Sequence, residues 1–274
     1  TMWIGDFNTG LVHRVKGDGT VISDIDLTGA PCNAARAESI AEGSDGAMWV
    51  TTGDSLCAVN VDGSNVRNFG NLGVGSLTGL EFDGSGHMWV ASGNGYVDEV
   101  NVDGTVAHQV TLGGEAPQNV IVSPADGDIY VADWNGSITQ IDPSTYATNV
   151  YAIDTLSYGS PTSIAASPDG SVWAVEYWNG FLAKLDPSSG TITQTKIATA
   201  PGSGGESITL GPDGNLYAAY ETSAIYKIAP ANGAVSVFSN GLSGQTIGVG
   251  AGPNNTIWTG EYTSGKIGRF SVTQ

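Results

Sequence analysis

The amino-acid sequence predicts an all-β fold, a seven-bladed β-propeller of four-stranded antiparallel blades, from three observations. An aromatic residue recurs in a β-rich stretch just after a turn, at steps of 40 to 46 residues. Glycine supplies 40 of the 274 residues and clusters with Asp, Asn and Pro at turns. Repeats of about 40–50 residues that hold several short strands each are typical of propeller blades. The recurring aromatics are Trp3, Trp49, Trp89, Tyr130, Trp173, Tyr217 and Trp258.

The repeats fill the whole chain, which predicts a single domain over residues 1–274. A blade can bury its faces only against its neighbours, so an unbroken series of repeats behaves as one unit. The approximate repeats are 1–31, 37–72, 77–112, 117–155, 161–199, 205–240 and 247–274.

The fifth repeat shows most clearly how one blade is built. Its four predicted strands cover residues 163–166, 172–175, 181–185 and about 191–197, with turns rich in Gly, Asp and Pro between them. The small residues of the first strand suit the crowded axis of a propeller. The aromatic residue of the second strand is expected to fill the gap between adjacent blades, as part of the core.

The two ends of the repeat series do not match. The first repeat begins at its second strand, and the last repeat ends after its third strand. Propellers usually close by pairing one terminus into the blade at the other end. We therefore expect the N-terminal closing strands, about 20–25 residues before Thr1, to be absent from this chain. The chain is then expected to be part of a larger polypeptide or assembly.

Charge limits the class of partner. The net charge is −18, from 27 acidic and 9 basic residues. Nucleic-acid binding needs a basic surface, so no nucleic-acid partner is expected. The sequence has no apolar run near the ~20 residues of a membrane helix, which predicts no membrane insertion. We expect the protein to lie outside the cell or on the surface of a cell or virion.

The two cysteines lie in neighbouring repeats. Cys32 falls in a loop between blades, and Cys57 begins the third strand of the next blade. Both are expected on the same face, where a disulfide is geometrically feasible. The alternative is two unrelated thiols, one exposed and one packed.

Parts of the repeat resemble a known family. The segment 208–217 reads Ile-Thr-Leu-Gly-Pro-Asp-Gly-Asn-Leu-Tyr, and the segment 257–262 is followed by Gly-Lys-Ile-Gly-Arg at 265–269. Both closely resemble the repeat of the streptogramin (virginiamycin B) lyase family of seven-bladed propellers. Residues 130–136 with 141–143 are equally similar to NHL-type binding propellers, so the resemblance indicates the fold more strongly than the chemistry.

The resemblance implies a reaction and a set of site positions. Lyases of this family open a cyclic depsipeptide lactone by elimination, with a general-base His and a magnesium ion at the central face. Their His residues stand where the chain enters the first strand of a blade. The three histidines of this chain, His13, His87 and His108, are expected far from the axis. The matching entry positions hold other residues: Glu38, Thr78, Gln118, Thr162, Glu206 and Ile247.

A second set of positions is predicted on the same face, three residues after each anchor aromatic: Asp6, Thr52, Ser92, Asp133, Glu176, Tyr220 and Glu261. Crowded carboxylates must take up protons, pair with a base or hold a cation. A calcium or magnesium ion held by Asp133, Glu176 and Glu261 is one candidate. The alternative is that these acids are solvated or cap backbone amides. Aromatic residues follow directly in several blades: Phe7, Trp134, Tyr177, Trp178 and Tyr262.

These observations favour a non-catalytic binding or scaffold module that recognises a glycan, peptide or protein. Its predicted ligand-binding face comprises Asp6, Glu38, Gln118, Asp133, Trp134, Glu176, Trp178, Glu206, Glu261 and Tyr262.

Two alternatives remain open. The first is a metal-dependent lyase or lactonase in which a carboxylate, Glu38 or Glu206, replaces the His of the family as base. The second is a structural spacer whose only role is rigidity.

Overall fold

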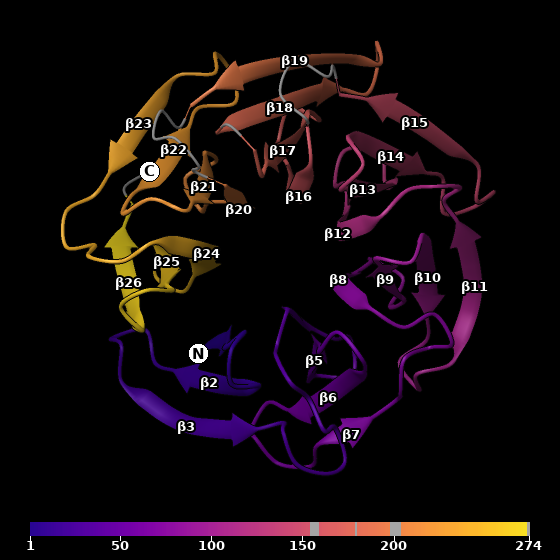
Figure 1. The fold of residues 1–274 in the computed structure, drawn as a ribbon, viewed down its shortest axis with the longest axis vertical. Coiled ribbons are helices and arrows are strands. Elements are labelled where there is room, and N and C mark those ends of the chain that lie inside the picture. The colour runs from indigo at the N-terminus through magenta and orange to yellow at the C-terminus, as the bar shows by residue number, and fades with distance from the viewer. Residues whose placement is uncertain (154–158, 179, 198–203, 273–274) are drawn as a thin grey trace. The chain divides into compact units, whose positions relative to one another are not determined.

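The computed structural model describes residues 1–153, 159–178, 180–197 and 204–272. These residues form 26 β-strands and no α-helix, and they divide into two compact units, Thr1–Val120 and Ile121–Gln274. Every sheet is an antiparallel meander in which strands adjacent in sequence are paired (Figure 1). The described part of the chain contains no helix long and apolar enough to cross a membrane.

The first unit holds three complete sheets. Their strands are β1 (Met2–Gly5), β2 (Leu11–Val15) and β3 (Val21–Asp26); β4 (Ser39–Glu42), β5 (Ala47–Thr51), β6 (Leu56–Asn60) and β7 (Arg67–Asn68); and β8 (Leu77–Phe82), β9 (Met88–Ser92), β10 (Tyr96–Val100) and β11 (Val106–Thr111).

A fourth sheet starts with β12, the strand in which the boundary between the units falls. Its strands are β12 (Pro117–Val122), β13 (Ile129–Asp133), β14 (Ser137–Ile141) and β15 (Thr148–Ala152).

The second unit continues with three further sheets. Their strands are β16 (Pro161–Ala166), β17 (Val172–Glu176), β18 (Phe181–Asp186) and β19 (Thr191–Lys196); β20 (Gly205–Leu210), β21 (Leu216–Tyr220), β22 (Ile225–Ile228) and β23 (Val235–Phe238); and β24 (Thr246–Gly252), β25 (Thr256–Glu261) and β26 (Lys266–Ser271).

The predicted fold class, an all-β seven-bladed propeller, is confirmed. Five sheets have four strands, and the first and last sheets have three each, as the mismatched ends of the repeat predict. Within the second unit, the first strands β16, β20 and β24 contact one another in sequence order. In the first unit the first strands β4 and β8 contact each other in the same way, and β4 also contacts β1, the second strand of the first repeat. This packing of inner strands is the feature that aligns the entry positions of neighbouring blades.

Turn chemistry accounts for the hairpins between the third and fourth strands of several blades. The Asp62 carboxylate accepts a hydrogen bond from the Ser64 backbone N–H at 2.8 Å, and Gly63 takes a positive φ of 89°. Asp18 and Asp103 cap the backbone N–H two residues ahead in the same way. These carboxylates serve the turns, as predicted.

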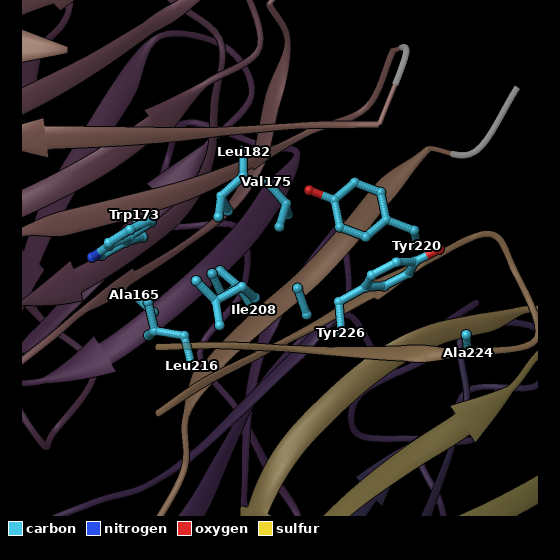
Figure 2. Packing of buried hydrophobic residues seen from close by; sticks show 11 residues of the cluster. Ala165, Trp173, Val175, Leu182, Ile208, Leu216, Tyr220, Ala224 and Tyr226 are labelled. Carbon is cyan, nitrogen blue, oxygen red and sulfur yellow. The ribbon is translucent and has the colours of Figure 1, made fainter. Parts of the chain in front are cut away.

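The anchor aromatics form the core between blades. Trp173 and Val175 of β17 lie against Ile208 and Leu216 of the next sheet (Figure 2). The Trp173 side chain is 4 % exposed. Fully burying a large aromatic side chain contributes several kcal/mol, so these contacts dominate the attraction between neighbouring sheets. The prediction that the recurring aromatics belong to the core is confirmed for six of the seven, whereas Trp3 is only partly buried and packs against the core.

Cys32 and Cys57 form a disulfide bond with an S–S distance of 2.08 Å. It joins the loop after β3 to β6, so it links the first sheet of the chain to the second. The disulfide expected from the sequence is therefore present, and the alternative of two unrelated thiols is excluded.

Candidate functional site

The first strands of four sheets carry a β-bulge near their start. The ladder between β20 and β21 slips by one residue at Glu206. The same slip occurs at Thr162 in β16, at Ile247 in β24 and around Thr78 in β8. A bulge leaves one residue outside the ladder and re-aims its side chain. These are the entry positions at which the family resemblance places catalytic histidines.

Threonine at two of these positions serves the packing of blades. The Thr78 hydroxyl donates a hydrogen bond to the Pro117 carbonyl at 3.1 Å. The Thr162 hydroxyl donates to the Gly205 carbonyl at 2.5 Å. In both cases the acceptor lies on the first strand of the next sheet, so these hydroxyls link neighbouring blades. Glu206 lies at an equivalent bulge, but its side chain is a carboxylic acid instead of a hydroxyl.

The Glu206 carboxyl is held in an unfavourable environment for charge. Partial burial and, to a smaller extent, the nearby charge of Glu221 raise its pKa to about 7. Burial, together with the charges of Glu221 and Glu206, also raises the pKa of the Tyr177 hydroxyl. A Cβ atom added at Gly204 would lie 2.9 Å from the Tyr177 ring and 3.1 Å from a Glu221 carboxylate oxygen. Gly204 therefore allows the ring and this carboxylate to come close together.

The Tyr177 ring, which feels the charge of both acids, belongs to a cluster of three aromatic rings. The Tyr177 ring centroid lies 5.3 Å from that of Trp134 and 4.7 Å from that of Trp178, and the Trp178 ring stands perpendicular to it. Trp134 and Trp178 are 6.5 Å apart. Trp178 is 47 % exposed, so part of the cluster faces solvent. All five residues belong to the second unit, and we define Trp134, Tyr177, Trp178, Glu206 and Glu221 as the aromatic–carboxylate site.

The chemistry of this site suits a cation or a hydroxylated ligand. Aromatic faces attract ammonium and guanidinium groups through the ring quadrupole. Two neighbouring carboxylates repel each other, and a bound cation removes that repulsion. Sugar hydroxyls could donate to the same oxygens while the sugar ring stacks on an exposed indole.

Three carboxylates predicted on the open face are buried instead. Asp133 and Glu176 are 0 % exposed and Glu261 is 3 % exposed. The Thr139 hydroxyl donates to Asp133 at 2.6 Å, and the Gln194 amide donates to both oxygens of Glu176. Each acid ends the second strand of its blade, where side chains from the third or fourth strand, or the following loop, reach it.

Glu261 has a different set of partners. The backbone N–H groups of Ser243 and Gly244 donate to its carboxylate at 2.7 and 2.6 Å. Burial raises the pKa of Glu261, but these hydrogen bonds more than compensate and lower it. Among the described residues, Asp133, Glu176 and Glu261 are not gathered into a shared ligand set. As arranged, they do not fit a common metal ion, and their role as ligands stays a prediction.

The predicted site residues of the first unit are tied to local partners. Arg36 forms an ion pair with Glu38, and the Arg36 guanidinium lies 5.4 Å from the centre of the Phe7 ring. Burial raises the pKa of Glu38, while Arg36 opposes this effect. The Asp6 carboxylate accepts the Asn8 backbone N–H at 2.8 Å. Glu38 therefore has a basic partner, Arg36. The charged neighbour of Glu206 is instead a second acid, Glu221.

The remaining predicted residues lie as follows. The Gln118 amide donates to the backbone carbonyl of Ala116 at 3.2 Å. Tyr262 is 52 % exposed and directly follows the buried Glu261.

Sequence reasoning missed Glu221, which directly follows Tyr220. Tyr177 occupies the equivalent position in the preceding blade, directly after the last residue of the second strand. Examining that position in every repeat could have found Glu221.

Comparison with known proteins places the chain in a family. The model of the virginiamycin B lyase family matches residues 78–274, which is more than half of the chain. The chain belongs to the virginiamycin B lyase family. No curated protein sequence matches this family member significantly.

Solved structures agree on the fold of this virginiamycin B lyase family member. It is similar to selenomethionine-substituted virginiamycin B lyase from Staphylococcus aureus, with a TM-score of 0.85, 19 % identity and coverage of 99 % of this chain and 91 % of that one. A streptogramin B lyase structure matches with a TM-score of 0.83 and 17 % identity, over 97 % of this chain and 88 % of that one.

A propeller outside the family is similar as well. The WD40 β-propeller domain of Doa1 matches with a TM-score of 0.78 and 15 % identity, over 99 % of this chain and 90 % of that one. At these identities the likenesses establish the propeller fold and leave the activity to be argued from the site.

Proposed function

We propose that this chain is a binding propeller that recognises a basic segment of a peptide or protein through the aromatic–carboxylate site. The observation that carries the proposal is the aromatic cluster of Trp134, Tyr177 and Trp178, whose central ring, Tyr177, feels the charges of Glu206 and Glu221. The proposal includes an extracellular or surface location. The Cys32–Cys57 disulfide supports that location, because such bonds persist mainly in oxidising compartments.

The electrostatics favour a cationic ligand over a neutral one. Glu206 and Glu221 raise each other's energy when both are charged, and a Lys or Arg side chain between them would relieve this repulsion. The exposed Trp178 ring offers an additional cation–π contact. The net charge of −18 would attract basic partners over longer distances and raise their association rate. A neutral glycan gains only the ring stacking and hydroxyl hydrogen bonds.

The test is calorimetric titration of a Lys/Arg-rich peptide at pH 8 and low salt, beside a panel of neutral oligosaccharides. Trp178→Ala and Glu221→Gln are expected to weaken peptide binding at least ~10-fold, because each removes a group that contacts the cation. Tyr262→Ala is the matched control, since Tyr262 is an exposed aromatic outside the site. Binding of an oligosaccharide that is lost in Trp178→Ala would assign a glycan instead. Peptide binding that all three variants retain would refute the site.

A specific observation also favours an enzyme as the second candidate. Glu206 stands at a bulge where the family resemblance places a general-base His, and its pKa of about 7 is that of an effective base at neutral pH. The reaction would be elimination or hydrolysis of a cyclic ester.

Turnover measurements separate the two candidates. Streptogramin B and a series of lactones would be incubated with metal-stripped protein, alone and after addition of magnesium or calcium. This design also tests the metal predicted from the sequence. Ring opening that disappears in Glu206→Gln but persists in Glu38→Gln would establish the enzyme. Absence of turnover under every condition would reject it and leave the binding proposal standing.

A further inference from the structure

Two of the three histidines in the chain lie on one sheet of the first unit, away from every position considered above. His87 directly precedes β9, and His108 lies in β11 of the same sheet. The acids Asp83 and Glu99 lie beside them, at the end of β8 and in β10. Imidazole and carboxylate together form a donor set that suits divalent transition metals.

The ligand atoms of three of these residues converge. One atom each from Asp83, His87 and Glu99 lies within 4.8 Å of the others. The His87 Nδ1 atom is 2.9 Å from a Glu99 oxygen and 3.8 Å from an Asp83 oxygen. Tetrahedral zinc with bonds of about 2.1 Å separates neighbouring ligand atoms by about 3.4 Å. The observed separations bracket that value, so only small side-chain rotations would be needed.

The surrounding structure fixes Asp83 and the backbone of His87 before any ion binds. Asp83 accepts hydrogen bonds from the backbone N–H groups of Ser85 and His87, each at 2.9 Å. The indole N–H of Trp89, which is fully buried, donates to the second Asp83 oxygen at 3.4 Å. Such partners orient metal ligands and are a regular feature of metal sites. The His87 side chain is 39 % exposed, which leaves a path for entry.

Strand register brings a fourth donor to the same face. Glu99 pairs with Trp89 on one side and with His108 on the other. Directly opposed residues of antiparallel strands have their Cβ atoms about 5 Å apart and point to the same face. His108 is therefore within reach of the Glu99 carboxylate.

We propose that Asp83, His87 and Glu99 form a Zn²⁺ site, with His108 as the fourth ligand. This site is independent of the proposed function in the second unit. Without metal, His87 contacts both flanking acids, and zinc binding would replace these contacts by metal bonds to Asp83, His87 and Glu99. A structural role is expected, because the ion would tie β10 and β11 to the turn before β9.

Competition between metal-stripped protein and a chromogenic zinc chelator tests the proposal. We expect one equivalent of Zn²⁺ to bind and Co²⁺ to give the intense visible absorption of tetrahedral coordination. His87→Ala and Glu99→Gln are expected to lower zinc affinity at least ~100-fold, and His108→Ala ~10-fold. Thermal unfolding without metal checks that each variant is folded, and added zinc should raise the midpoint of the wild type but not that of His87→Ala or Glu99→Gln.

His13 supplies the matched control. It also lies between two carboxylates, but Asp24 faces its Nδ1 atom at 2.8 Å while Asp6 faces its Nε2 atom at 4.0 Å. Because the acids use opposite ring nitrogens, they cannot share one ion with this imidazole. His13→Ala should leave zinc binding unchanged. Stoichiometric binding that survives in folded His87→Ala, or that is lost in His13→Ala, would overturn the assignment, as would the absence of binding by the wild type.

Discussion

Replacement of Glu206 by Gln should stabilise the protein at alkaline pH. The carboxyl has a pKa raised from 4.5 to about 7, first by burial and then by the charge of Glu221. A carboxyl whose pKa is raised by folding binds protons more tightly in the folded state. Its protonated form therefore favours folding below about pH 4.5, and this contribution is lost as the pH rises through 7. Gln keeps the shape of the protonated acid but has no charge to lose.

The size of the effect follows from the shift. The rise from 4.5 to about 7 corresponds to roughly 3.5 kcal/mol, at ~1.4 kcal/mol for each unit of pKa. The side chain is only partly buried, so solvent screening reduces this to about 1.5 kcal/mol. We expect Glu206→Gln to exceed the wild type by that free energy of unfolding at pH 8 and to match it near pH 4.5.

Urea unfolding followed by tryptophan fluorescence at both pH values provides the measurement. Glu221→Gln is the control, because removing the second acid should give a smaller gain at pH 8 while Glu206 remains in place. A Glu206→Gln variant that is no more stable than the wild type at pH 8 would refute the account. Equal stabilisation at both pH values would do the same, because that result has no dependence on charge.

Three further predictions concern the fold. Trp173→Ala removes the anchor between two sheets and should lower the free energy of unfolding by about 3–5 kcal/mol in urea titrations, whereas a loss below ~1 kcal/mol would contradict its core role. Cys57→Ser removes the disulfide to Cys32, which closes a loop of 25 residues, and should lower the free energy of unfolding by about 3 kcal/mol. An unchanged unfolding midpoint would count against this estimate. Glu81→Gln should stabilise the protein at pH 8 but not near pH 4.5, because burial alone raises the pKa of Glu81 to about 7. Calorimetric unfolding at the two pH values checks this, and equal midpoints of variant and wild type at pH 8 would disprove it.

The repeat pattern predicted the architecture because its signals are local. The anchor aromatics Trp49, Trp89 and Trp173 alternate with turn residues at fixed spacing, and each blade needs only its own strands and one neighbour to bury them. The three-stranded first and last sheets followed from the same spacing.

The sites depended on contacts between distant strands, which the spacing does not reveal. Asp133 and Glu176 were expected on the ligand-binding face, as metal ligands or as solvated acids, yet Thr139 and Gln194, on the third and fourth strands of their blades, reach back to them. The pairing of Glu206 with a second acid depends on the loop that follows the next strand. The convergence of Asp83, His87 and Glu99 depends on cross-strand register and on the conformation of one turn, so histidines judged remote from the axis were set aside.

The bulges at the start of the first strands allow side chains of the site to change while the fold stays the same. A residue such as Glu206 or Ile247 lies outside the hydrogen-bond ladder, so exchanging its side chain breaks no backbone pair. Each of these blades thus offers one adaptable position on a rigid frame. Relatives could acquire or discard a catalytic histidine by single codon changes, and a small combinatorial library restricted to these positions would explore new specificities without redesigning the scaffold.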